Sequence, residues 1–544
     1  MSILISYESN SVIGKNMHKN KFIFGDASAI RKYGVQEFED NYFWPVSDSD
    51  FDKFSRYMHN TYVELISDIK DDNLYDIALV ELSFVHQLIQ IFHYNYIKEY
   101  AKENEIKLLV GGDSYVYRSP DWMQLGEGYS SLKFPFGSVR RLLRKIVKNI
   151  YFNKHLPVLK ILKGFLCKES IVSIGSMDPL KMSFIKQKNA FVNHCDWIDI
   201  INLKNTKTIN NNSFFTENII SPFLRNVKKS DILFIRNIDF VEIAEIWKQR
   251  FNDLSGLYSG LINTENLMNI LLVSDMSKPL SKLITMSLQR KKVDIFCFHH
   301  GNDACYARLA LMHETTICHC NTFVTPTNGI RERYQKNYSN NIIAKRSNIK
   351  FISINSDYYS KLISMYNFRT NLNIKKIMLI GFPLNSYRYS YENNLFFYKM
   401  ISLEYRLIIA LKKAGYYVLY KAHPDRLNEI EGIFNDTVDE YIPHPFETVW
   451  QKADMLLFTY TSTTTFGYAL TTNLPILLVD SAKKNRDTDD YKLMQSRIKI
   501  LPAKVDNNMK IQFSEKSLID TISNKMVNNF DFSYVDNILG KKYF

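Results

Sequence analysis

Short apolar runs alternate with amphipathic helical patterns along this chain of 544 residues. Most of the runs are almost continuous in apolar and β-branched residues, which is typical of parallel strands buried on both faces. Helical patterns fit between the runs, for example over 401–414. The runs that predict strands are 106–112, 231–237, 269–275, 293–301, 376–383, 415–424, 453–460 and 474–480. This alternation predicts an α/β architecture with doubly wound parallel sheets.

A polar, tyrosine-rich stretch at 353–376 lacks a periodic apolar face, and it predicts a domain boundary. We expect two Rossmann-like domains, at 1–355 and 356–525, followed by a tail, 526–544, that crosses back to the first domain. Ligands of such sheets bind beyond the carboxyl ends of the strands, and in two-domain versions they bind in a central cleft that both domains face.

The composition is that of a folded, basic protein. Hydrophobic residues make up 46% of the chain and aromatic residues 14%, which excludes an intrinsically disordered chain. The formal net charge is +13, and much of it lies in one place, because residues 128–168 contain no Asp or Glu. The basic residues of this stretch are Lys133, Arg140, Arg141, Arg144, Lys145, Lys148, Lys154, Lys160, Lys163 and Lys168.

Apolar residues interleave with these basic residues at roughly helical spacing, which predicts one apolar and one cationic face. This pattern suits an anionic membrane surface, a nucleic acid or, more simply, an amphipathic helix against a core. No apolar run reaches the roughly 18–20 residues that span a bilayer, and the N-terminus lacks a signal-peptide pattern. The six cysteines fit a reducing compartment. We expect a cytoplasmic protein, with 128–168 as the candidate for peripheral attachment to the inner face of the plasma membrane.

The first motif that carries chemistry is Lys421-Ala422-His423-Pro424, directly after the residues GYYVLY (415–420) of the predicted strand. A Lys and a His two residues apart at the carboxyl end of a strand can both face a phosphate, while Pro424 ends the strand. The simpler alternative is a surface lysine and a packed histidine.

The second motif is a run of hydroxyl side chains at 459–465, between a predicted strand and a predicted helix. Hydroxyl groups and free N–H groups at the start of a helix can bind an anion. The alternative is simple capping of the helix, which needs only one of these residues.

Taken in order, these motifs resemble those of GT-B glycosyltransferases of bacterial capsule and O-antigen assembly. The nearest likenesses are transferases that use CMP-Kdo or CMP-sialic acid, and the CDP-glycerol glycerophosphotransferases. The resemblance covers about a third of the chain, from 293 to 480. It consists of FHHG (298–301), the segment 321–335, IGFP (380–383), the Lys-x-His-Pro motif, HPFETVWQKAD (444–454), the hydroxyl run and LPILLVD (474–480).

The resemblance implies a donor site for a nucleotide sugar in the C-terminal domain. In those families the Lys-x-His-Pro motif and the Ser/Thr turn hold the nucleotide, and Glu447 stands where a carboxylate would bind ribose hydroxyls. The residues implied here are Lys421, His423, Pro424, Glu447, Thr461, Ser462 and Thr463. Two departures leave the donor open: Gly467 or Tyr468 stands where relatives often carry an acid, and Thr459 stands where the glycerophosphotransferases carry Asp.

The catalytic group of GT-B enzymes comes from the N-terminal domain. Asp113 follows a predicted strand and two glycines, and we favour it as general base or nucleophile. His300, after the strand at 293, is the candidate contact to phosphate or acceptor. Asp275 and His299 also follow predicted strands, and for each of these residues a purely structural role remains an alternative.

We expect neither a metal nor another cofactor. Four Cys and four His lie within 297–320, but Cys318-His319-Cys320 lacks the usual spacing of zinc ligands. The Asp-x-Asp pairs at 48–50 and 487–489 do not directly follow strong strands, and GT-B enzymes generally need no metal.

The sequence therefore predicts an enzyme that transfers a sugar, preferably a CMP-activated ulosonic acid such as Kdo or a sialic-acid-like sugar. The acceptor is expected to be a growing or lipid-linked surface glycan. One rival is a CDP-polyol phosphotransferase of teichoic-acid-like polymer synthesis. The other is a basic protein that binds nucleic acid without catalysis, which is disfavoured because it leaves the motifs after successive strands unexplained.

Overall fold

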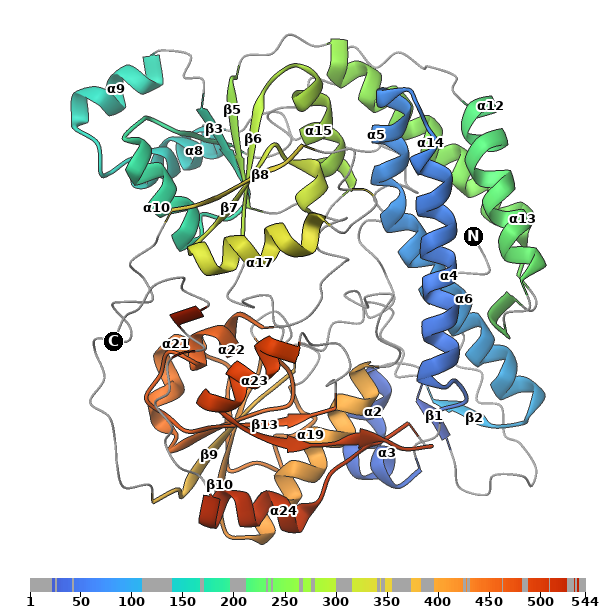
Figure 1. Cartoon of the computed structure of the whole chain (residues 1–544), viewed down its shortest axis with the longest axis vertical. Helices are drawn as coiled ribbons and strands as arrows, with labels where there is room; N and C mark the ends of the chain where they lie inside the picture. Colours follow the sequence, from blue (N-terminus) through green and yellow to red (C-terminus); the bar gives the residue numbers. More distant parts are fainter. Residues whose placement is uncertain are drawn as a thin grey trace.

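Two six-stranded parallel sheets form the body of the protein, one in the upper and one in the lower half of Figure 1. The structure is a computed structural model of the whole chain. It describes residues 22–24, 27–41, 44–109, 139–166, 171–195, 212–230, 233–235, 238–263, 268–274, 279–299, 316–339, 343, 348–354, 373–382, 396–423, 427, 431–461, 463–481, 488–507, 509–525, 533 and 536–537.

The N-terminal sheet has the strand order β4-β3-β5-β6-β7-β8, and all of its neighbouring strands are parallel. The strands are β3 (Ile171–Ile174), β4 (Asn193–Cys195), β5 (Ile270–Val273), β6 (Asp294–Phe298), β7 (Thr322–Thr325) and β8 (Lys350–Ser353). Alternate residues pack on opposite faces. Leu272 and Phe298 meet α10 (Pro179–Lys188), whereas Leu271 and Ile295 belong to the core that includes α15 (Pro279–Arg290). Burial on both faces explains the continuous apolar runs.

The C-terminal sheet has the order β11-β10-β9-β12-β13-β14, again with all neighbours parallel. Its strands are β9 (Lys376–Ile380), β10 (Tyr417–Lys421), β11 (Glu440–Ile442), β12 (Met455–Phe458), β13 (Ile476–Asp480) and β14 (Lys499–Pro502). Numbered along the chain, this order is 3-2-1-4-5-6, the order of a dinucleotide-binding Rossmann sheet. The strand order reverses between β9 and β12, which is where ligands of such sheets bind.

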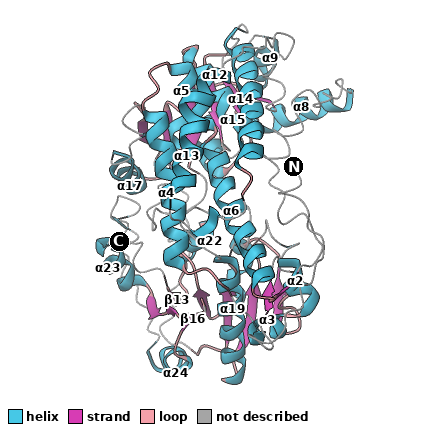
Figure 2. Ribbon diagram, turned by 90° about the vertical axis from the view of Figure 1, so that its right-hand side faces the viewer, coloured by secondary structure: helices cyan, strands magenta, loops and turns pink. Residues whose placement is uncertain are grey.

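A layer of long helices accompanies the N-terminal sheet. It contains α4 (Asp48–Ser67), α5 (Asp72–Val80), α6 (Leu82–Glu103) and α14 (Phe240–Asn263). A buried ion pair joins two of its helical segments, because Arg250 donates to both carboxylate oxygens of Glu81 at 2.8 and 2.9 Å. α4 and α6 run from beside the upper sheet down to the lower half of the molecule (Figures 1 and 2).

By length and composition, the helical stretch 72–103 is apolar enough to cross a bilayer. A helix of this kind was not predicted from the sequence. However, 71% of its most apolar window is buried inside the protein, as in the core helix of a soluble protein.

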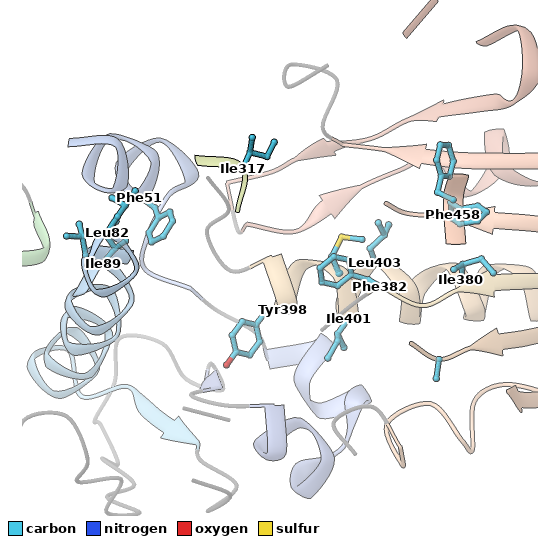
Figure 3. Close-up of a cluster of buried hydrophobic side chains, with 14 of the residues drawn as sticks. Phe51, Leu82, Ile89, Ile317, Ile380, Phe382, Tyr398, Ile401, Leu403 and Phe458 are labelled. Carbon is cyan, nitrogen blue, oxygen red and sulfur yellow. The ribbon is translucent and has the colours of Figure 1, made fainter. Parts of the chain in front are cut away.

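The first described elements pack against the C-terminal half of the molecule. They are β1 (Phe22–Phe24), α2 (Ala27–Tyr33) and α3 (Val35–Asn41), and β1 pairs with β2 (Lys107–Leu109) in a separate two-stranded sheet. Trp44 stacks on Tyr398 of α19 (Phe396–Lys413) with ring centroids 5.3 Å apart. Figure 3 shows Tyr398 between Phe51 of the long helices and Ile380 of the C-terminal sheet, within one continuous core.

A partly buried carboxylate fixes this contact. Glu39 of α3 lies 2.9 Å from Lys510 Nζ and 3.3 Å from Arg406 Nε, and it accepts a 2.6 Å hydrogen bond from Ser402. Arg406 and Ser402 belong to α19, so one side chain from the start of the chain is held by three from the C-terminal half.

The predicted fold class, α/β with two Rossmann-like doubly wound sheets as in the GT-B fold, is confirmed. The cleft between the two halves stays a prediction. The boundary at 355/356 falls outside the described residues, and the packing of 22–41 on the C-terminal half was not foreseen. In the tail, Asn537 accepts a 2.6 Å hydrogen bond from Arg333 of α17 (Asn328–Ser339). The crossing of the tail to the N-terminal domain stays a prediction.

One expected strand is wrong. The described part of 231–237 forms a 3₁₀ turn, Leu233–Ile235, in which Phe234 is fully buried against Phe54 and Tyr96. Aromatic packing against the long helices takes the place of strand pairing there. Each of the other seven expected runs contains a strand.

We predict that Glu39→Gln weakens the docking of α2 and α3. Hydrogen bonds to a charged group are worth about 1.5–3 kcal/mol, so amide hydrogen exchange in 27–41 should accelerate about tenfold or more. Glu37→Gln, an exposed change in the same helix, is the matched control. Equal exchange in the two variants would show that the Glu39 contacts do not hold this segment in place.

Candidate functional site

The carboxyl ends of β10, β9 and β12 lie level with one another. In the register of the sheet, Lys421 pairs with Ile380, and Ile380 pairs with Phe458. The residues that follow these three positions therefore emerge side by side beyond the edge of the sheet. Both motifs that the sequence singled out, at 421–424 and 459–465, thus begin at neighbouring strand ends on the two sides of β9.

Glu404 of α19 links these three strand ends. Its carboxylate accepts hydrogen bonds from the backbone N–H of Phe382 at 2.8 Å, the hydroxyl of Tyr420 at 2.8 Å and the hydroxyl of Thr459 at 3.4 Å. The side chain is fully buried, and burial raises the pKa of Glu404 to about 7, although its three hydrogen bonds act in the opposite direction. This residue sets the relative positions of β9, β10 and β12 where a ligand would approach.

Neither Glu404 nor Tyr420 was predicted from the sequence as a site residue. The available signal was a single acidic residue within the apolar face of 401–414, because Glu404 shares that face with Met400, Ile401 and Ile408, all of which are buried. A buried acid among apolar residues requires hydrogen-bond donors around it, which only the folded chain supplies.

Gly381 allows β9 and β10 to approach closely. A Cβ atom at this position would lie 2.5 Å from the Tyr420 hydroxyl oxygen, and the Gly381 N–H donates to Lys421 O at 2.9 Å. Glycine is therefore required in the Gly-Phe-Pro motif so that Tyr420 can reach Glu404.

Lys421 provides the cation of the site. Its side chain is 3% exposed, and burial lowers the pKa of Lys421 to about 8, while the nearby carboxylate of Glu447 partly offsets this effect. Its Nζ donates to the carbonyl of Ala422. Glu447 is exposed in the first turn of α21 (Phe446–Val449), and His423 is half-buried just beyond the strand. The structure thus brings Lys421 within electrostatic reach of Glu447.

The threonine turn after β12 has a structural role as well. Thr463 is the N-cap of α22 (Thr464–Ala469), and its hydroxyl oxygen accepts the N–H of Phe466 at 3.0 Å. Its own N–H donates to Thr461 O at 2.8 Å, and both threonines are buried. Capping therefore accounts for Thr463, the simpler of the two interpretations, whereas it does not require the hydroxyl of Thr461.

Four of the sequence-predicted site residues lie outside the described residues, namely Asp113, His300, Pro424 and Ser462. The strand before Asp113 is β2, which pairs with β1 and lies outside the six-stranded N-terminal sheet. His299, which directly follows β6, is 2% exposed and packs edge-on against Tyr334 with ring centroids 5.3 Å apart. The catalytic role of Asp113 and the contact role of His300 stay predictions.

The cysteines of 297–320 that the structure describes are buried and form no disulfide. Cys297, Cys318 and Cys320 belong to the hydrophobic core, and Cys320 donates to Ile317 O at 3.2 Å. Within the described part of the chain, no group of three or more His, Cys, Asp or Glu side chains is arranged to hold a metal ion.

No protein-family model matches the chain, and no curated protein matches it. Among solved structures, UDP-N-acetylglucosamine 2-epimerase from Rickettsia bellii is similar, with 14% sequence identity and a TM-score of 0.35. The match covers 69% of this chain and 93% of the epimerase chain. It is a loose likeness of fold.

We predict that Glu404→Gln changes how stability depends on pH. The folded state holds the Glu404 proton more tightly than the unfolded state, so this group's contribution is complete below about pH 4.5 and is lost as the pH rises through about 7. Relative to the Gln variant, wild type should lose up to about 3 kcal/mol over this window.

Urea unfolding at pH 5 and at pH 8 measures this difference. Glu431→Gln is the control, because Glu431 is exposed. If the gap between wild type and Glu404→Gln is the same at both pH values, Glu404 does not titrate as its burial implies.

Proposed function

We propose that this protein is a nucleotide-sugar-dependent glycosyltransferase whose donor site lies beyond the carboxyl ends of β9, β10 and β12. The observation that carries the proposal is the coincidence of two independent features. The strand order of the C-terminal sheet reverses between β9 and β12, and the phosphate-type motifs follow β10 and β12 directly. A buried lysine at that edge supports an anionic ligand, because the nearby carboxylate of Glu447 offsets only part of the cost of burying its charge.

In this proposal Lys421 and His423 hold the phosphate of the donor, and the hydroxyls of Thr461 and Ser462 donate further hydrogen bonds to it. Glu447 accepts hydrogen bonds from ribose hydroxyls near the same strand end. These contacts position the donor and stabilise the charge that develops on the leaving phosphate.

The reaction joins an acceptor hydroxyl oxygen to the anomeric carbon of the sugar. The bond between that carbon and the phosphate oxygen breaks, the nucleotide leaves, and the hydroxyl proton passes to a base. Asp113 is the proposed base or nucleophile, and His300 is the proposed contact to phosphate or acceptor. The preferred donor is a CMP-activated ulosonic acid, and the acceptor is a growing or lipid-linked glycan. The site residues proposed here include no metal ligand.

We predict that CMP stabilises the protein in a thermal-shift panel of CMP, CDP, UDP and GDP. A ligand at 100 times its Kd adds about 2.7 kcal/mol, which raises the melting temperature on the order of 5 °C. His423→Ala should abolish this shift, whereas Lys413→Gln, an exposed change at the end of α19, should preserve it.

Other outcomes of this panel, and those of a separate transfer assay, are decisive too. A shift with UDP or GDP and none with CMP would overturn the donor assignment. Transfer from CDP-glycerol but not from CMP-sugars would select the polyol phosphotransferase. An unchanged shift in His423→Ala would refute the phosphate site.

We also predict that nucleotide affinity depends on pH through Lys421. The pKa of this lysine is lowered to about 8 in the free protein, so Lys421 loses its charge above that pH. The affinity for the nucleotide should therefore be constant below about pH 8 and weaken by up to about tenfold per pH unit above it. Lys421→Gln should bind more weakly at pH 7 and should lose this dependence. Calorimetric titrations between pH 7 and pH 9.5 measure both effects, and an identical pH profile in the variant would exclude Lys421 from the site.

A further inference from the structure

Two basic helices lie at the outer edge of the N-terminal sheet. They are α8 (Val139–Phe152) and α9 (Val158–Leu166), and α8 packs beside the edge strand β4. Figures 1 and 2 show both helices at the periphery of the upper half, far from the C-terminal sheet.

α8 docks on β4 through polar side chains. Asn149 accepts the N–H of His194 at 2.6 Å and donates to its carbonyl at 3.2 Å. One turn further along, Asn153 accepts the N–H of Val192 at 2.9 Å and donates to its carbonyl at 2.9 Å. Both asparagines are at most 1% exposed. Two amide side chains therefore satisfy the open backbone edge that β4 would otherwise present.

This docking leaves the apolar face of α8 pointing outward. Leu143, Val147, Ile150 and Tyr151 occupy positions i, i+4, i+7 and i+8 of one helix face, and between 48% and 65% of each side chain is exposed. An ordinary amphipathic helix buries such a face and exposes its polar residues. α8 instead buries Asn149 and exposes these four apolar residues, so this face does not serve the core.

α9 continues the same surface. It is anchored at Gly164, whose position leaves no room for a Cβ atom against the Phe191 ring, and Lys160 donates to the carbonyl of Asn189. Its apolar side chains remain outside, with Val158 71%, Leu159 75% and Leu162 54% exposed. Of the eleven exposed large hydrophobic residues in the described chain, seven lie on these two helices.

The charged residues of the two helices themselves have one sign. Residues 139–166 contain eight Lys or Arg and no Asp or Glu. Lys148, Lys154 and Lys163 are exposed beside the apolar residues, and Lys154 Nζ lies 4.6 Å from the centre of the Tyr151 ring.

We propose that α8 and α9 together form a docking surface for an anionic lipid bilayer. Only a bilayer offers negative headgroups above an apolar interior, so it satisfies both the cationic and the apolar side chains. A second copy of this chain on the same surface would bring two acid-free basic stretches together. A nucleic acid would neutralise the lysines and leave the seven apolar side chains in water. The surface does not depend on the donor site, so each can be tested without the other.

The test is co-sedimentation of the full chain with vesicles of phosphatidylcholine, alone or mixed with phosphatidylglycerol. Wild type should bind the mixed vesicles and release them as salt rises. The double variant Val147→Ser/Leu159→Ser should partition onto the mixed vesicles about tenfold or more weakly, since each substitution removes methyl groups that the bilayer would bury. Lys148→Gln/Lys163→Gln should lose about tenfold at low salt.

Val241→Ser is the matched control, because Val241 is 73% exposed but lies on α14, away from this surface. It should bind like wild type. All variants should keep the wild-type melting temperature, since the changed side chains are exposed. Failure of wild type to bind mixed vesicles, or equal loss in Val241→Ser, would overturn the proposal. A wild-type dimer that Val147→Ser/Leu159→Ser dissociates would also overturn it and would assign the surface to self-association.

Discussion

The buried carboxyl group of Glu404 is the interaction on which the candidate site depends. A polar group in a fully buried position must be hydrogen-bonded, and Glu404 meets this requirement with donors from β10, from the residue after β12 and from the second residue after β9. The same three hydrogen bonds that satisfy Glu404 also hold Phe382, Tyr420 and Thr459 in fixed relative positions. The edge where the strand order reverses is thus fixed from within the core.

The two halves of the molecule are connected by more than the chain that links their sheets. Elements from the start of the chain pack on the C-terminal half, with Glu39 held by Lys510 and Arg406 and with Trp44 stacked on Tyr398. The long helices α4 and α6 continue from there to the N-terminal sheet (Figure 1). A substitution at this junction would therefore disturb the placement of one sheet against the other as well as local stability.

Six of the eight interior strands of the two six-stranded sheets, and the positions of the motifs, could be predicted from the sequence, because strands such as β9, β12 and β13 are buried on both faces and read as unbroken apolar runs. The interior strands β3 and β7 were missed. Edge strands were not predicted. β4 has the sequence Asn-His-Cys and β11 has the sequence Glu-Tyr-Ile. A strand at the edge of a sheet needs fewer apolar residues than a central strand, so it is recognised only from its pairing with the neighbouring strand. Glu404 and the docking asparagines of α8 were missed for a related reason: their roles are set by tertiary hydrogen bonds that no local pattern encodes.

Hydrogen exchange with saturating CMP tests the central claim most directly, because it reports which backbone segments a nucleotide covers. The account predicts slower exchange at 381–382, 421–423 and 459–463, the residues beyond three adjacent strand ends, and little change in the N-terminal sheet. Protection confined to the N-terminal sheet, or no protection at these three segments despite binding, would contradict a donor site at the β9, β10 and β12 ends.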